Sequence, residues 1–205
     1  MITKEILDNA FSYQEYREQT EDLLAQNKTT GNNQSEQLVG FTKLNVHRMN
    51  RLDKTIIIND GIANTLQNLT SNQIWVVIAE AWCGDCAQLI PYLEKLALKS
   101  EGKITLRIIY RDENPQLMDA YMTDNTRSIP KLIALNPEDL KTVFIWGPRP
   151  KPAQAIMHNY KANKDSITWE QFELSLHTWY SVDKGQTTLE EISQLLRPFT
   201  HIEIN

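Results

Sequence analysis

The stretch from Ile74 to Ala97, IWVVIAEAWCGDCAQLIPYLEKLA, decides the fold and holds both cysteines of the 205-residue chain. Its first part, IWVVIAEA, is a continuous apolar run rich in β-branched residues, which is typical of a strand buried on both faces. An amphipathic stretch from about Cys86 to Lys99 predicts a helix. Cys83 and Cys86 are therefore expected at a strand-to-helix turn.

The position of the cysteine pair suits thiol–disulfide exchange. The dipole and the free N–H groups at a helix N-terminus favour an anion, so they favour the reactive thiolate of Cys83. Cys86 would lie one helical turn further on, close enough to attack a mixed disulfide formed on Cys83. Cys83 is thus the expected nucleophile and Cys86 the expected resolving cysteine.

The same pair could supply half of a metal site. A closed zinc site needs four ligands, and its usual patterns pair cysteines or histidines at short spacing. The four histidines lie far in sequence from one another and from the cysteines; they are His47, His158, His177 and His201. We expect no metal site within one chain, whereas a cluster shared between two chains stays open as an alternative.

The order of predicted elements indicates a mixed α/β fold. A strand from about Lys103 to Tyr110 follows the cysteine helix, and IPKLIALN and KTVFIWG predict two further strands joined by a hairpin turn. Strand–helix–strand implies a parallel pair, and the hairpin adds antiparallel strands. We therefore expect a mixed sheet with helices on both sides.

Helices are predicted before and after this sheet. Residues 1–55 are expected to form an N-terminal helical extension packed on a main domain at 56–205, and Ser12 with Glu15 predicts a capping box. Three C-terminal helices are predicted at about Ala153–Asn163, Trp169–Tyr180 and Leu189–Leu196. Thr188 and Glu191 predict a capping box for the last of them.

Three features of the sequence resemble the thioredoxin family. AEAWCGDC resembles the thioredoxin active-site segment, in which a strand ends in Trp-Cys-Gly-Pro-Cys. Pro91 stands where thioredoxins carry the proline that kinks the active-site helix, and SIPKLIAL stands where they carry Ile-Pro or Thr-Pro ahead of the hairpin. The resemblance covers roughly Ile74 to Gly147. It implies a thioredoxin-like fold with extra N-terminal and C-terminal helices, and a cis bond between Ile129 and Pro130 that faces the cysteines.

The resemblance also implies an activity, that of a protein-disulfide oxidoreductase. The expected partners are protein disulfides and an upstream redox protein that donates electrons, with no cofactor. Trp82 would shape the docking surface, and the backbone beside Ile129 and Pro130 would pair with a substrate chain. The alternative is a redox-silent binding or scaffold module, which the added helices favour because they can cover or extend the substrate groove.

Two departures from the thioredoxin pattern concern acids near the cysteines. Gly84 is kept, but Asp85 replaces the family's proline, and a negative charge near Cys83 disfavours its thiolate. Many thioredoxins bury an aspartate six residues before the first cysteine, where this chain has Val77. The nearest acid is Glu80, which could accept the proton of Cys86 through water if it points inward; otherwise it would face solvent or pair with a lysine.

Composition excludes other classes of function. The chain is 41% hydrophobic and 23% charged, with a formal net charge of −5 and no basic cluster. Binding to nucleic acid or to an anionic membrane is therefore not expected. No apolar run approaches the roughly 18 residues that span a bilayer. The start, MITKEILDNAFSYQEY, lacks the apolar segment of a signal peptide, so we expect a cytoplasmic protein.

Overall fold

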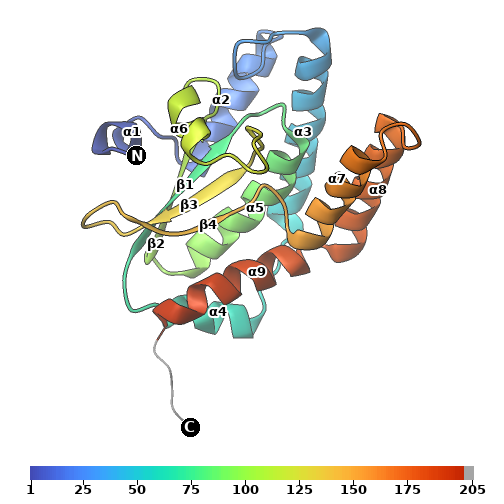
Figure 1. The fold of residues 1–205 in the computed structure, drawn as a ribbon. Helices are drawn as coiled ribbons and strands as arrows, with labels where there is room; N and C mark the ends of the chain where they lie inside the picture. The colour runs from blue at the N-terminus through green and yellow to red at the C-terminus, as the bar shows by residue number, and fades with distance from the viewer. Residues whose placement is uncertain (201–205) are drawn as a thin grey trace.

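A four-stranded mixed sheet lies at the centre of the computed structural model, which describes residues 1–200 (Figure 1). The strands, in the spatial order β2-β1-β3-β4, are β1 (Gln73–Ala79), β2 (Ile104–Tyr110), β3 (Lys131–Leu135) and β4 (Thr142–Trp146). Strand β1 pairs parallel with β2 and antiparallel with β3, and β4 pairs antiparallel with β3. The predicted mixed sheet is confirmed.

Helices precede, connect and follow the strands. Those of the described chain are α1 (Lys4–Asp8), α2 (Tyr13–Ala25), α3 (Glu36–Thr55), α4 (Asp60–Gln67), α5 (Gly84–Lys99), α6 (Pro115–Ala120), α7 (Lys151–Ala162), α8 (Trp169–Asp183) and α9 (Gln186–Leu196). The predicted capping box of α2 is present, because Glu15 N bonds to the Ser12 hydroxyl and the Glu15 carboxylate accepts from Ser12 N.

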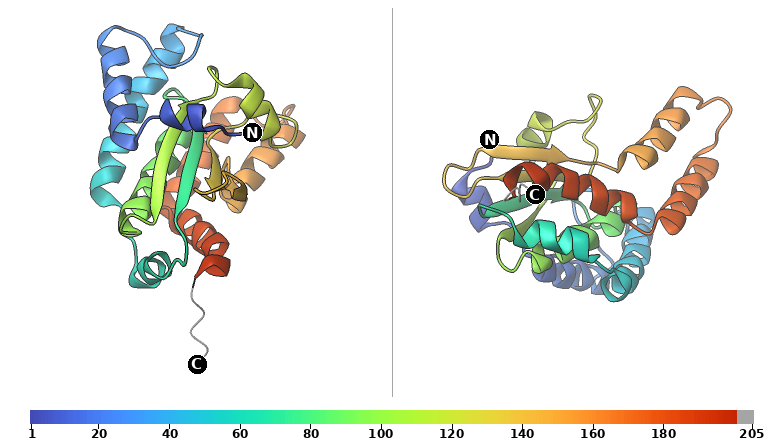
Figure 2. Two further views of the ribbon diagram at one scale, coloured as in Figure 1. Left: turned by 90° about the vertical axis from the view of Figure 1, so that its left-hand side faces the viewer. Right: turned by 90° about the horizontal axis from the view of Figure 1, so that it is seen from below.

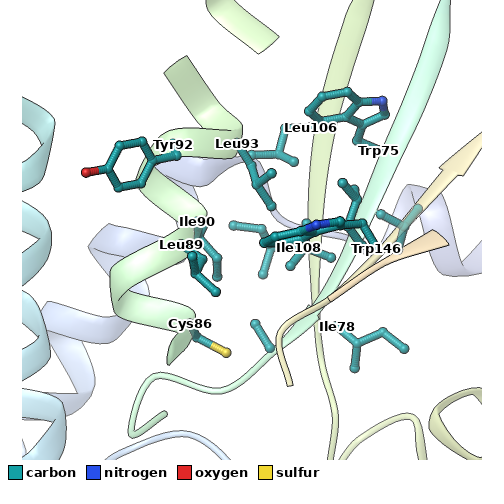
Figure 3. Packing of buried hydrophobic residues seen from close by; sticks show 14 of the residues in the cluster. Trp75, Ile78, Cys86, Leu89, Ile90, Tyr92, Leu93, Leu106, Ile108 and Trp146 are labelled. Carbon is teal, nitrogen blue, oxygen red and sulfur yellow. The ribbon is translucent and has the colours of Figure 1, made fainter. Parts of the chain in front are cut away.

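The core lies between the sheet and α5. Every residue of β1 from Trp75 to Ala79 is fully buried, as expected for a central strand covered on both faces. Leu89, Ile90 and Leu93 of α5 pack onto this strand and β2 (Figure 3). Helices α4 and α9 pack against α5 on the same side of the sheet, and α6 lies on the opposite side (Figure 2).

The N-terminal helices join the same core. Helix α3 packs along α5, and Met49 and Leu52 of α3 are buried there. Tyr16 of α2 is fully buried in the same apolar cluster. The division of the chain into residues 1–55 and 56–205 stays a prediction.

Helices α7 and α8 form a hairpin that projects from the sheet beyond α5 (Figure 1). Its two helices are joined by aromatic contacts, including a stacked pair of Tyr160 and Phe172 with ring centroids 4.8 Å apart. Within residues 1–200, no helix has the length and apolar character needed to cross a membrane.

The predicted capping box at Thr188 is wrong. Lys184 and Gly185 both adopt left-handed backbone conformations, with φ of 51° and 80°, and this tight turn lets α9 begin at Gln186. Thr188 is therefore buried inside the helix. The Glu191 carboxylate binds elsewhere, since it accepts from Trp146 Nε1 and from the backbone N–H of Lys151, both at 2.8 Å.

Candidate functional site

The two cysteines differ in how far solvent can reach them. Cys83 is the N-cap residue of α5 and is 9% exposed, whereas Cys86 is fully buried. The Cys83 sulfur accepts from the backbone N–H of Cys86 at 3.5 Å, which is the contact expected at a helix N-terminus. Cys83 is therefore the less buried of the two cysteines.

Cys86 lies at the end of the apolar core. Its sulfur points into the space between α5 and the strands (Figure 3). Burial, and then the neighbouring Cys83 thiol, raise the pKa of Cys86 well above its ordinary value. A thiol in this setting stays protonated until a nearby group takes its proton.

Glu80 is fully buried, so the expectation that it faces solvent or pairs with a lysine is wrong. Its Oε1 accepts from the backbone N–H of Asp112 at 2.9 Å, and its Oε2 is buried without a hydrogen-bond partner. Burial raises the pKa of Glu80 above its ordinary value. The inward orientation is the condition under which Glu80 could serve Cys86.

The Ile129–Pro130 peptide bond is cis, the isomer that the resemblance implies. Both residues are buried beside the cysteine turn, by which we mean residues 82–85 between β1 and the first turn of α5. The Ile129 carbonyl accepts from the Cys83 thiol at 3.5 Å. The backbone before the proline therefore reaches the sulfur of Cys83.

Asp85 is buried in a network with the C-terminal part of the chain. Its carboxylate accepts from the hydroxyl of Tyr180 on α8 at 2.7 Å and forms an ion pair with Arg149. Asp85 thus ties the cysteine turn to the chain that follows β4. The Arg149 guanidinium balances the negative charge that Asp85 brings to this turn.

Arg48 brings a second guanidinium to the cysteine turn from α3. Its Nη1 donates to the carbonyl of Gly84 at 3.2 Å and to Asn45 Oδ1 at 3.1 Å. Within residues 1–200, no carboxylate lies within 4 Å of this guanidinium. Burial lowers the pKa of Arg48, and the charge of Asp85 opposes this shift. Its hydrogen bonds to Asn45 and Gly84 both go to neutral groups.

The cysteine turn forms the floor of a cleft of about 400 Å³. Residues of helices α3 and α8 line its walls, and Arg149 also borders it. The lining residues are Leu38, Phe41, Leu44, Asn45 and Arg48 of α3; Trp82, Cys83, Gly84 and Asp85 of the turn; Arg149; and Trp169, Phe172, Glu173, Leu176 and His177 of α8. The added helices thus build the space in front of the reachable sulfur.

The residues expected to contact a substrate divide between two places. Trp82 lines the cleft, and the Arg111 guanidinium lies 4.8 Å from the centroid of its ring. Ile129 and Pro130 do not line it. Sequence reasoning missed Arg48, Arg149 and Tyr180, because no local motif links these positions to the cysteines.

Metal ligands are not gathered at the cysteines. Among residues 1–200, no group of three His, Cys, Asp or Glu side chains could hold a metal ion. His177 lines the cleft, while His158 pairs with Asp124 on the surface. His201 lies outside the described residues.

The mixed sheet, the cysteine turn at the start of α5 and the buried Ile129–Pro130 bond beside it together define a protein of the thioredoxin-like class. The family model described as Thioredoxin matches residues 31–163, which is more than half of the chain, so the chain belongs to the thioredoxin family.

The curated relatives match this chain over only part of their own length. Thioredoxin 1 of Nostoc sp. is 40% identical over 52 residues, which are 25% of this chain and 46% of that protein. The thioredoxin of Rhodospirillum rubrum is 44% identical over 52 residues, which are 25% of this chain and 47% of that protein. The chain therefore spans about half the length of the curated relatives it matches.

A solved structure shares the fold over most of the chain. The crystal structure of an HIV epitope-scaffold aligns with a TM-score of 0.54 and 15% sequence identity, covering 92% of this chain and 99% of that one. At this identity the likeness concerns the fold alone. It extends to both helical additions, since so little of either chain is left unmatched.

Proposed function

We propose that this chain is a thiol–disulfide oxidoreductase in which Cys83 is the nucleophile and Cys86 the resolving cysteine. The observation that carries the proposal is the asymmetry of the pair: Cys83 caps α5 and is reachable from the cleft, while Cys86 is fully buried one turn away. A reachable thiol beside helix N–H groups is the one that can be ionised and attack. A buried neighbour can attack only the sulfur beside it.

The exchange needs no cofactor. The Cys83 thiolate attacks one sulfur of a substrate disulfide; the S–S bond breaks, and its electron pair leaves on the other substrate sulfur. Cys86 then loses its proton and attacks the Cys83 sulfur, which releases the remaining substrate thiol. The substrate gains two electrons and the enzyme keeps a Cys83–Cys86 disulfide, which an upstream dithiol protein reduces.

Glu80 is the proposed acceptor of the Cys86 proton. Its backbone carbonyl accepts from the backbone N–H of Cys83 at 3.1 Å, which places the residue beside the cysteine turn, and its side chain is buried. Its raised pKa brings its proton affinity closer to the working pH, as general acid–base catalysis requires. The proton of Cys86 would reach this carboxylate through one bridging water.

The proposed substrate is a protein disulfide in a segment that can enter the cleft, and the proposed location is the reducing cytoplasm. When Cys83 loses its proton, the Ile129 carbonyl loses its donor. Although Ile129 lies outside the cleft lining, we propose that a substrate chain bound at Cys83 reaches this carbonyl with a backbone N–H. Trp82 and Gly84 would contact that chain from the floor of the cleft.

Insulin reduction by dithiothreitol tests the proposal. The wild-type chain should accelerate precipitation of the reduced insulin B chain, and a Cys83→Ser variant should not. The alternative, a redox-silent binding module, is favoured by one observation: only 9% of Cys83 is exposed between the added helices. Equal precipitation rates for both proteins would support that alternative and defeat the enzyme proposal for protein disulfides.

A further inference from the structure

We propose that the cleft binds an extended acidic segment of the substrate polypeptide, and that Arg48 recognises the acidic side chain next to the substrate cysteine. This inference rests on the proposed exchange function and names its substrate class. It concerns the residues that the N-terminal helices and α8 add to the site, rather than the cysteines themselves.

The shape of the cleft suits an extended chain. Along α3 its lining runs from Leu38 to Arg48, which at about 1.5 Å per helical residue is a length of roughly 15 Å. Along α8 it runs from Trp169 to His177, roughly 12 Å by the same rise. An extended peptide advances about 3.3 Å per residue, so some four residues fit between the walls. A folded surface cannot follow, because Cys83 lies on the floor between two helices.

The walls of the cleft offer apolar contact area. Leu44 of α3 is 63% exposed and Trp169 of α8 is 48% exposed, and both lie in the lining. Phe41 and Leu176 line the cleft more deeply. These side chains would cover apolar residues of a bound segment on either side of its cysteine, and in doing so would be removed from water.

The charges that face the cleft place a free cation beside Cys83. Asp85 and Arg149 neutralise each other, and the Tyr180 hydroxyl donates to Asp85. Arg48 donates to Gly84, the residue that follows Cys83, and has no carboxylate within ion-pair distance in the described chain. Glu173 lines the opposite wall, and Arg48 and Glu173 both lie close enough to His177 to shift its pKa, in opposite directions.

Short cysteine peptides test this recognition directly. Three peptides of sequence X-Cys-X, with X as Glu, Gln or Lys, are prepared as mixed disulfides with 2-thiopyridine. A Cys86→Ser background stops the reaction after the first attack. Cys83 then forms a disulfide with the peptide sulfur, and the electron pair of the broken bond leaves with 2-thiopyridone, whose absorbance reports the rate.

The Glu peptide should react about tenfold faster than the Gln peptide, the factor expected from one hydrogen bond to a charged group, and the Lys peptide should be slowest. Arg48→Gln should abolish the preference for Glu, while Arg48→Lys should retain part of it. Arg51→Gln is the matched control: it removes one positive charge from the same helix outside the cleft lining and should leave the preference unchanged.

Several outcomes would overturn the inference. Equal wild-type rates for the Glu and Gln peptides would do so without any Arg48 variant, so the test survives a variant that fails to fold. If Arg48→Gln slows all three peptides equally, Arg48 acts on the Cys83 thiolate and does not recognise the peptide side chain. If a mixed disulfide of 3-mercaptopropionate reacts as fast as the Glu peptide, the carboxylate alone is recognised and the cleft does not select a polypeptide. Failure of all disulfides to react faster than with Cys83→Ser would instead defeat the exchange function.

Discussion

Replacing Asp85 should lower the free energy of unfolding more than replacing an exposed acidic residue of the chain. In an Asp85→Ala variant the Arg149 guanidinium loses its anion, although only 11% of the Arg149 side chain is exposed. The buried Tyr180 hydroxyl loses its acceptor at the same time. Both groups would then remain away from water without the partner that compensates for their burial.

The size of the loss follows from that burial. Breaking a buried ion pair by removing one partner costs about 3–5 kcal/mol. Arg149 keeps a hydrogen bond to Gln154 at 3.2 Å and borders the cleft, which admits water, so the low end applies. We expect a loss of about 3 kcal/mol in the free energy of unfolding, which for a chain of this length lowers Tm by about 6–12 °C.

Urea denaturation followed by circular dichroism measures this loss, and Asp119→Ala is the matched control. Asp119 pairs with Arg127 at 2.6 and 2.7 Å, but 47% of the Asp119 side chain is exposed. The control removes the same charge from a solvated pair and should leave the midpoint close to that of the wild type. An Asp85→Ala midpoint as close to the wild type as that of Asp119→Ala would refute the reasoning.

A double-mutant cycle isolates the pair from its surroundings. Arg149→Met alone leaves Asp85 without its cation, whereas the double variant Asp85→Ala/Arg149→Met leaves neither charge unpaired. The double variant should therefore be less destabilised than the sum of the two single variants. Strict additivity would show that the two side chains stabilise the fold independently of each other.

Two further predictions concern Glu80 and Gly185. Burial raises the pKa of Glu80, so the native state keeps this proton to a higher pH than the unfolded chain does. The free energy of unfolding should therefore fall as the pH rises from the unfolded-state pKa through the native-state pKa. In urea titrations over this pH interval, Glu80→Gln should become more stable relative to the wild type. A stability difference that does not vary with pH, or an unchanged pH profile of disulfide reduction, would argue against the role given to Glu80. Gly185→Ala should lower Tm by several degrees, because φ of Gly185 is +80° and the new Cβ would lie 2.0 Å from Tyr92 Cε1. Gly40→Ala is the control, since the space around Gly40 is open, and it should not destabilise the protein.

The fold could be predicted from local sequence because its signals are local. The apolar run of β1 and the Ser12–Glu15 capping box each act over a few residues, and the structure has both. The capping box at Thr188 failed because a turn just outside the motif set the start of the helix. A motif therefore predicted well only where no neighbouring backbone constraint competed with it.

The site was predictable only around the cysteines themselves. The position of Cys83 at the start of α5 follows from the strand-to-helix turn, and the structure has it there. The role of Asp85 did not follow, because its partner Tyr180 lies 95 residues away and is brought near only by the packing of α8. Arg48 was missed for the same reason, since its contact with Gly84 depends on how α3 packs along α5.

Trapping the mixed disulfide tests the central claim most directly. A Cys86→Ser variant, incubated with a disulfide substrate and mapped by mass spectrometry, should carry the substrate thiol on Cys83, and the wild type should release it. A Cys83→Ser variant should form no adduct on the buried Cys86 over the same time. An adduct on Cys86 that forms as fast as the one on Cys83, or no adduct on Cys83 at all, would contradict the assignment of Cys83 as the nucleophile.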